Sequence, residues 1–264
     1  MPVLPRIPSL VKQLLPLFPL AFTLCSVAVP AQLAKPRFKA VAIAEAGGIH
    51  KPFVDAAQVW LNQLAKRENF AVDYIQNTDK IDDQFLSHYQ LFIQLNYPPY
   101  MWTSTAMAAF RKYIEEGRGG WIGFHHATLL GEFDGYPMWP WFSDFMGGIR
   151  FKDYIATFST AHVVVEDKNH PVMRGLPEIF VIDNEEWYAW DRSPRPNVHV
   201  FARVDESTYT PDSPLKMGNH PVVWSNEHVK ARNVYIFMGH RPEHFKNPNF
   251  TTLFRNSIFW AANQ

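Results

Sequence analysis

GGWIGFHHA, at residues 119–127, is a glycine-rich apolar run that ends in two histidines. The run predicts a buried strand that stops at a sharp turn. A glycine, one intervening residue and then a functional residue is the pattern of the strand-to-helix turn called a nucleophile elbow. Here the elbow residue is His125 rather than Ser or Cys, so acyl-enzyme chemistry is not favoured. An imidazole at this turn can act as a general acid or base or bind a metal, and the alternative is a histidine that caps the next helix.

Strand and helix patterns alternate on the amino-terminal side of this run. Short apolar segments predict strands, and apolar residues at helical spacing predict amphipathic helices. The predicted strands are 40–44, 70–75, 91–95 and 119–124, and the predicted helices are 52–67, 81–86 and 103–116. This alternation predicts an α/β fold with a mostly parallel sheet and helices on both faces.

The carboxyl-terminal half is less regular. Residues 131–151 are rich in glycine and aromatics and predict a long loop or lid. Further strands are predicted at 161–166, 180–183, 199–204, 221–224 and 233–238, some of them antiparallel, with a closing helix at 249–262. We expect one domain over residues 37–264.

Residues 1–31 have the parts of a secretory signal peptide. Arg6 and Lys12 precede the apolar run 14–29, and Val29-Pro30-Ala31 offers small residues for cleavage after Ala31. The run is too short and too broken by prolines for a comfortable membrane span, although an uncleaved anchor is the alternative. We therefore expect an exported protein, periplasmic or extracellular, without a stable membrane span once the leader is removed.

Charge and cysteine content exclude several classes of function. The chain has 25 basic and 25 acidic residues, which argues against a general nucleic-acid binder. Its single cysteine, Cys25, lies inside the leader, so the mature chain has no disulfide, no multi-cysteine metal site and no cysteine nucleophile.

The ends of the predicted strands carry the residues with the most chemistry. In open parallel sheets, ligands bind beyond the carboxyl ends of the strands. Imidazoles follow three such ends and carboxylates follow a fourth, so we expect them to share one site. The residues concerned are His50, His125, His126, Glu185, Glu186, Trp187, Tyr188, His240 and Arg241.

The sequence resembles the ThuA-like (trehalose utilisation) family over residues 37–264. The resemblance rests on the glycine-rich strand that ends in His125, on HPVMRGLP at 170–177, and on EEWY at 185–188, where the family usually has Asp-Glu-x-Tyr. It also rests on PVVW at 221–224 and on MGH at 238–240, which precede Asn247-Pro248 and the closing helix. There are two departures: Glu185 replaces the usual Asp, and Lys152-Asp153-Tyr154 stands where relatives often carry another histidine.

This resemblance implies a flavodoxin-like, class I glutamine amidotransferase-like sheet in which the amidotransferase nucleophile is replaced. It also implies a role in sugar metabolism, often beside dehydrogenases that make 3-keto sugars. Glutamine amidotransfer is itself disfavoured, because the mature chain has no cysteine and the elbow has no serine.

Two hypotheses follow for the function. In the first, the protein is an enzyme that isomerises, eliminates or hydrolyses a keto sugar or keto-glycoside, with His125, Glu186 and His240 as catalytic residues. His50, His126, Trp187, Tyr188 and Arg241 would bind the carbohydrate, and His50, His125, Glu186 and His240 could hold a divalent metal such as zinc. In the second, the protein is a non-catalytic carbohydrate-binding or accessory protein with an aromatic cleft.

Several of these residues also have a structural interpretation. Glu186 could cap a helix or pair with Arg241, and Trp187 and Tyr188 could be core. His170, in Asn169-His170-Pro171, is best explained as a turn residue. One aromatic group could be either packing or a platform for sugar rings: Trp102, Trp139, Trp141 and Phe142. The sequence does not predict the oligomeric state.

Overall fold

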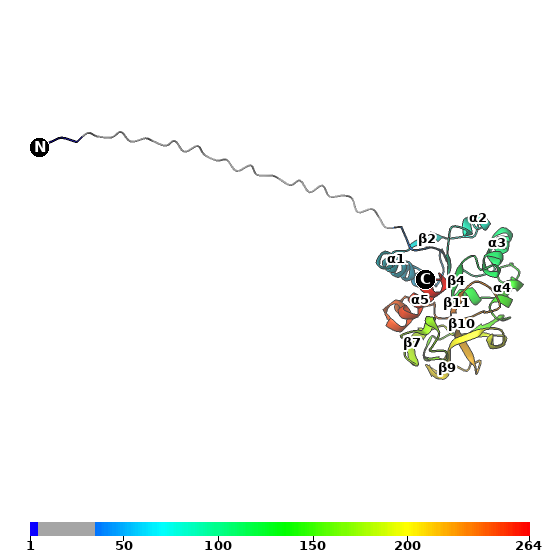
Figure 1. Ribbon diagram of the computed structural model, residues 1–264. Coiled ribbons are helices and arrows are strands. Elements are labelled where there is room, and N and C mark those ends of the chain that lie inside the picture. The colour runs from blue at the N-terminus through cyan, green and yellow to red at the C-terminus, as the bar shows by residue number, and fades with distance from the viewer. Residues whose placement is uncertain (5–34) are drawn as a thin grey trace. The chain divides into compact units, whose positions relative to one another are not determined.

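The computed structural model describes residues 1–4 and 35–264. The chain separates into two units, residues 1–34 and 35–264, and the second unit contains the folded elements (Figure 1). The predicted leader therefore lies almost entirely outside the described residues. Within the described part of the chain, no helix is both long and apolar enough to cross a membrane.

The first half of this unit alternates strands and helices, as predicted. Strands β1, β3 and β4 are runs of mostly buried side chains, the edge strand β2 is only partly buried, and the longer helices bury one face. The elements are β1 (Lys39–Ala44), α1 (Lys51–Glu68), β2 (Ala71–Ile75), α2 (Asp83–Leu86), β3 (Leu91–Leu95), α3 (Ser104–Glu115) and β4 (Gly120–Phe124).

Local signals set the ends of the two long helices. Pro52 stands in the first turn of α1, where its missing N–H costs nothing, and Asn69 ends that helix in the left-handed conformation. The hydroxyl of Thr103 caps α3 by accepting from the Ala106 N–H at 3.2 Å.

The second half holds shorter helices and the remaining strands. A 3-10 turn, η1 (His125–Thr128), follows β4 directly. The other elements are α4 (Pro140–Phe145), β5 (Phe151–Tyr154), β6 (Ser159–Val165), η2 (Pro171–Met173), β7 (Ile179–Glu185), β8 (Tyr188–Trp190), η3 (Arg195–Asn197), β9 (His199–Thr210), β10 (His220–Ser225), β11 (Asn233–Ile236), η4 (Pro242–Lys246) and α5 (Pro248–Ala261).

Nine strands form one mixed sheet in the order β2-β1-β3-β4-β11-β10-β9-β6-β7. The five strands from β2 to β11 are parallel neighbours, and each pairing beyond β11 is antiparallel. The strand direction reverses at each of the four pairings from β11 to β7, so β7 runs in the same direction as β11. The carboxyl ends of β1, β4, β11 and β7 therefore face one edge of the sheet.

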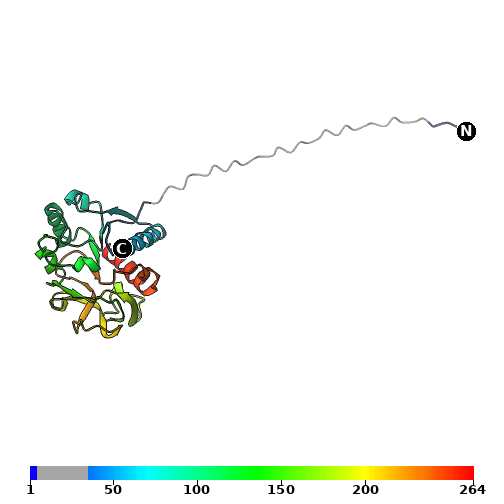
Figure 2. The same cartoon turned by 180° about the vertical axis from the view of Figure 1, so that it is seen from behind.

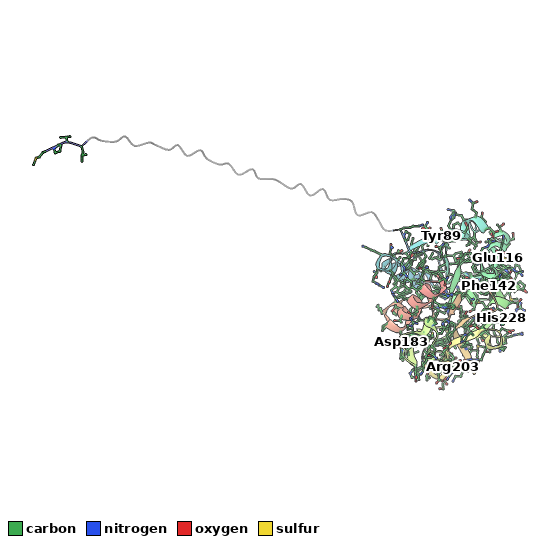
Figure 3. All side chains as sticks on the ribbon, viewed as in Figure 1. Tyr89, Glu116, Phe142, Asp183, Arg203 and His228 are labelled. Carbon is green, nitrogen blue, oxygen red and sulfur yellow. The ribbon has the colours of Figure 1, made fainter. Side chains whose placement is uncertain are left out.

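Helices cover both faces of the sheet. Helices α1 and α5 lie on one side, with α2, α3 and α4 on the other, and the reverse view shows the same division (Figures 1 and 2). Phe124 of β4 packs against Phe254 of α5 on one face, and Trp121 packs against Phe142 of α4 on the other. Phe142, labelled in Figure 3, is fully buried. The α/β fold with helices on both faces is confirmed.

The predicted loop at 131–151 contains more structure than expected. Phe133 and Tyr136 form a β-bridge across a tight turn, in which Asp134 and Gly135 both have positive φ. Helix α4 follows, and Phe151 begins the two-stranded sheet β5-β8. The segment is therefore a hairpin followed by helix α4, and it ends where β5 begins.

Candidate active site

Four buried side chains from four separate segments converge beyond the carboxyl edge of the sheet. His50 follows β1, His125 follows β4, His240 follows β11 and Glu186 follows β7. Each offers one nitrogen or oxygen atom, and these atoms all lie within 4.8 Å of one another. The residues that the sequence predicts at separate strand ends thus lie in one cluster.

His125 occupies a strained turn at the centre of the cluster. Its φ is +36°, a region that non-glycine residues rarely adopt. Two glycines leave room for this turn. A Cβ on Gly123 would lie 2.1 Å from the Trp121 ring, and a Cβ on Gly239 would lie 2.7 Å from the Cβ of His125. The elbow geometry predicted at His125 is therefore present, and it points an imidazole into the site.

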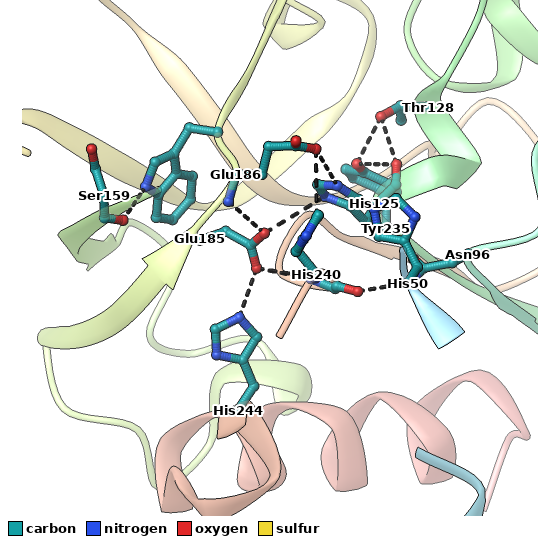
Figure 4. Close-up of polar contacts among 12 residues, drawn as sticks. His50, Asn96, His125, Thr128, Ser159, Glu185, Glu186, Tyr235, His240 and His244 are labelled. Atoms are coloured by element: carbon teal, nitrogen blue, oxygen red, sulfur yellow. Dashed lines mark hydrogen bonds and ion pairs between the residues drawn. The ribbon is translucent and has the colours of Figure 1, made fainter. Parts of the chain in front are cut away.

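Glu186 joins two of the histidines. Its Oε2 lies 3.3 Å from Nε2 of His125 and 3.5 Å from Nδ1 of His240 (Figure 4). Burial would raise the pKa of Glu186, but the hydrogen bond with His125 and the nearby His240 imidazole outweigh it and hold that pKa at about 2. Glu186 is therefore an ionised carboxylate at neutral pH. It makes no ion pair with Arg241, which instead lies 3.3 Å from Glu243.

Glu185, a second carboxylate, supports the cluster from behind. Its Oε2 accepts from His244 Nε2 at 2.7 Å and from the Gly239 N–H at 3.0 Å, and its Oε1 lies 3.8 Å from His125 Nδ1 (Figure 4). These contacts outweigh burial and hold the pKa of Glu185 at about 2. His125 therefore sits between two carboxylates, one at each ring nitrogen.

Glu45 supports the opposite side of the cluster. Its Oε2 lies 3.5 Å from His50 Nδ1 and 3.6 Å from His126 Nδ1. Burial would raise its pKa, but the nearby imidazoles of His126 and His50 hold it at about 2. Glu45 and His244 were not among the predicted site residues, and neither was Asn96, which donates to the Gly239 carbonyl at 2.7 Å.

The imidazoles are packed closely and shielded from water. The His50 ring lies 4.5 Å from the His240 ring and 5.0 Å from the His125 ring, centroid to centroid. Burial lowers the pKa of His50 to about 3, against the opposing effect of the nearby Glu45 carboxylate, and burial also lowers the pKa of His125. Both rings are therefore neutral near pH 7, and each keeps one unprotonated ring nitrogen.

The donor set suits a divalent metal. In a tetrahedral site with bonds of about 2.1 Å, neighbouring ligand atoms lie about 3.4 Å apart. The separations from Glu186 to His125 and His240, 3.3 and 3.5 Å, fit this spacing. Both ring nitrogens of His50 and Nδ1 of His240 are buried without a hydrogen-bond partner among the described atoms. Such orphaned groups are costly, and coordination would satisfy one nitrogen of each ring. Glu45 and Glu185 lie where carboxylates commonly orient metal-bound histidines.

The remaining predicted site residues separate into three groups. The His126 ring packs 3.9 Å from that of His50, and Tyr188 packs 4.4 Å from His125, so both border the cluster. Arg241 lies farther out, over the ring of Phe158. The prediction that Trp187 binds the carbohydrate is wrong. Its indole is 1% exposed, donates to the Ser159 carbonyl at 2.8 Å and stacks on Phe237. Its ring lies in the core between Phe237 and Tyr209 and makes no contact with the four converging groups.

The aromatic group considered as a platform for sugar rings packs inside the fold instead. Its members are Trp102, Trp139, Trp141 and Phe142. Trp102 and Trp139 are buried against each other and against Phe110, and Phe142 is fully enclosed. Trp141 is half-buried and stacks on Phe145. His170 is the turn residue that the sequence indicates, because its ring nitrogen accepts from the Val172 N–H.

A different set of aromatic side chains borders the cluster. Phe158 packs 4.5 Å from the His240 ring, and Phe151 packs 5.0 Å from Tyr188. Phe133 connects Phe151 to Tyr100, which also faces Tyr136. We call this set the aromatic rim: Tyr100, Phe133, Tyr136, Phe151 and Phe158. Its members are partly exposed, unlike the buried tryptophans.

The α/β sheet and the strained turn directly after β4 are those of a class I glutamine amidotransferase-like fold. In this chain, His125 occupies the elbow position of that turn. The sequence profile of the ThuA family, described as trehalose utilisation, matches residues 39–261. The chain therefore belongs to the ThuA family.

Solved structures agree with this assignment. A ThuA-like protein from Bacteroides uniformis ATCC 8492 is 32% identical, with 88% of this chain and 95% of that chain covered and a TM-score of 0.76. A ThuA-like protein from Parabacteroides merdae ATCC 43184 is 19% identical, with 86% and 90% covered and a TM-score of 0.61. A Thermoplasma acidophilum protein described as a GMP synthase component shares the fold at 13% identity, with 86% and 94% covered and a TM-score of 0.54. No match was found among the curated proteins.

Proposed function

We propose that this protein is an exported enzyme that acts on a keto sugar or keto-glycoside, with His125, Glu186 and His240 as its acid–base residues. The observation that carries the proposal is the convergence of four buried groups, delivered by four segments, within 4.8 Å. Burying three imidazoles beside a carboxylate is costly for a merely structural purpose. Membership of the trehalose utilisation family supports a carbohydrate as the substrate.

We further propose that His50, His125, Glu186 and His240 hold a divalent metal such as zinc. Imidazole nitrogens and carboxylate oxygens are ligands that zinc commonly takes in proteins. A bound metal would polarise a carbonyl or hydroxyl oxygen of the sugar. The nitrogens of His50 and His240 that lack hydrogen-bond partners among the described atoms support this assignment.

The chain's own residues would then handle the proton. Isomerisation or elimination of a keto sugar begins when a C–H bond next to the carbonyl breaks and its proton passes to a base, leaving the charge on the carbonyl oxygen. One residue cannot hold a metal and take up this proton at once, so this acid–base function belongs to the metal-free site. There the neutral His125 imidazole would accept the proton, and the ionised Glu186 beside it would stabilise the imidazolium that forms. His240 contacts both Glu186 and Phe158 at the rim, so it could return the proton to a leaving oxygen. In hydrolysis, His125 with Glu186 would deprotonate water.

The aromatic rim would bind the sugar ring. The C–H faces of pyranoses pack on aromatic rings much as other apolar groups do. Tyr136 and Tyr100 are the outer members, and the Tyr100 hydroxyl lies 3.4 Å from Asp134 at the hairpin tip. His126 and Tyr188 border the cluster, and Arg241 beside Phe158 could contact a sugar hydroxyl.

The test is turnover of 3-keto disaccharides by the purified protein, with and without a chelator. We expect turnover in both arms or in one: turnover that falls with the chelator and returns with zinc supports the metal-assisted reaction, and turnover that survives the chelator supports the metal-free one. His125→Ala should abolish it, and the exposed His88→Ala serves as the matched control. Unchanged turnover in His125→Ala would remove this residue from the mechanism. Sugar binding without turnover across the panel would instead indicate the accessory, non-catalytic function, which the aromatic rim also supports.

A further inference from the structure

An open cavity of about 530 Å³ lies at the edge of the sheet opposite the histidine cluster and has a different chemistry. Its lining consists of Arg37, Pro171, Arg174, Arg232, Arg255, Asn256, Phe259, Trp260 and Gln264. We call it the arginine cleft. Arg37 precedes β1 and Arg232 precedes β11, so the cleft lies at the amino ends of the strands that carry His50 and His240 at their carboxyl ends.

Three of the guanidinium groups are held against aromatic rings. Arg37 lies 5.3 Å and Arg255 4.9 Å from the centre of the Phe259 ring, and Arg232 lies 5.6 Å from that of Trp260. Arg232 also donates to the Trp260 carbonyl at 3.1 Å. Stacking on a ring fixes the plane of a guanidinium and leaves its edge N–H groups available to a ligand.

The cleft has a large excess of positive charge. Four of its nine lining residues are arginines, and none is acidic. Among the described residues, the one carboxylate that forms an ion pair with any of the four is Glu68, 2.8 Å from Arg255. Arg37, Arg174 and Arg232 have no carboxylate partner within residues 35–264. Four guanidiniums around one concave space repel one another, and an anion between them would relieve that repulsion.

We propose that the arginine cleft binds a small phosphorylated ligand. Arginine forks match phosphate oxygens in paired hydrogen bonds, and several of them together favour a ligand with more than one negative charge. The concave shape favours a soluble molecule over an extended surface. This site is separate from the histidine cluster, and the proposal does not depend on the reaction catalysed there.

Calorimetric titration with inorganic pyrophosphate tests this proposal. We expect one equivalent to bind, and we expect Arg37→Gln/Arg232→Gln to weaken binding by about ten-fold or more, since each lost charged contact contributes on the order of 1 kcal/mol. Arg174→Gln is a milder second variant, because its exposed side chain makes no hydrogen bond or ion pair with described residues; we expect about three-fold weaker binding. Arg192→Gln, an exposed arginine in the loop after β8 that pairs with Asp191, is the matched control and should bind as the wild type.

Two results would overturn the proposal. One is pyrophosphate binding that is absent, or equally strong in the wild type and both cleft variants. The other comes from a parallel arm with vesicles of phosphatidylcholine and phosphatidylglycerol. Cleft-dependent vesicle binding without pyrophosphate binding would assign the arginines to a lipid headgroup instead.

Discussion

The carboxylate of Glu185 lies 2.7 Å from Nε2 of His244, and neither side chain is more than 2% exposed. The same carboxylate accepts from the backbone N–H of Gly239, the residue before His240. The end of β7 is thereby joined to the segment after β11, although three strands separate β7 from β11 in the sheet order. This contact places Glu186 beside His125 and His240.

Replacing this carboxylate should loosen the cluster without removing a proposed ligand. Glu185→Gln keeps the shape but loses the charge that faces His244 and His125. We expect a loss of about 1–3 kcal/mol in the free energy of unfolding and about 10–100-fold weaker zinc binding. Urea unfolding of the chelated protein and zinc titration measure the two effects. Glu178→Gln, in an exposed pair with Lys168, is the control. Zinc affinity equal to that of the wild type would show that Glu185 does not orient the cluster.

The packing of Gly239 against His125 gives a second prediction. A methyl group on Gly239 would lie 2.7 Å from the Cβ of His125 and 3.0 Å from Oδ1 of Asn96, so the elbow must shift. We expect Gly239→Ala to cost about 1–3 kcal/mol of stability and to lower turnover by displacing His125. Gly47→Ala is the control, because a Cβ there meets no atom within 4 Å. If both variants matched the wild type in melting temperature and turnover, the elbow would not depend on this contact.

The sequence predicts most of the fold and all four converging groups, for a clear reason. Buried parallel strands are continuous apolar runs, and residues after their carboxyl ends share one edge of the sheet. His50, His125 and His240 follow β1, β4 and β11 in this way. Glu186 was predicted by the same rule, but its strand lies at the far edge of the antiparallel half. It reaches the site because β7 runs in the same direction as β11 and Glu185 joins the two ends.

The missed and misplaced residues have physical explanations too. Trp187 lies between Glu186 and Tyr188, and successive side chains in extended backbone point to opposite sides, so its neighbours face the site and it faces the core. Glu45 follows β1 directly and could have been found as a carboxylate at the same edge. His244 lies in a 3-10 turn with no local signal, and its role depends on a contact with Glu185, 59 residues away.

The aromatic rim predicts an effect on binding rather than on chemistry. Tyr136 is 47% exposed at the hairpin and contacts Tyr100 rather than the histidines. We expect Tyr136→Ala to raise KM for a keto disaccharide by about 3–10-fold, the value of one stacking contact, with little change in kcat. Val59→Ala, exposed on α1, is the control. A fall in kcat at constant KM would argue against a binding role for the rim.

The pH dependence of stability can be tested at Glu206, away from the histidine cluster. Its carboxylate accepts from the backbone N–H groups of Met217 and Gly218 and faces His220 at 3.0 Å. Burial would raise the pKa of Glu206, but the His220 hydrogen bond and the two backbone bonds lower it below the ordinary 4.5. A lowered folded-state pKa contributes stability that is complete above about pH 4.5 and is lost as the pH falls through the folded value.

We therefore expect Glu206→Gln to be less stable than the wild type at pH 7, with the difference shrinking as the pH falls below about 4.5. Urea unfolding at pH 7, 5, 4 and 3 measures it, with Glu178→Gln as the control. A difference that stayed constant down to pH 3 would contradict the lowered pKa.

The most direct test of the account is zinc titration of the chelated protein against a competing indicator. We expect one equivalent to bind, with affinity reduced by about 100-fold or more in His240→Ala and in Glu186→Gln, and unchanged in His88→Ala. No binding by the wild type, or equal binding by all four proteins, would contradict the proposal that His50, His125, Glu186 and His240 form one metal-dependent site.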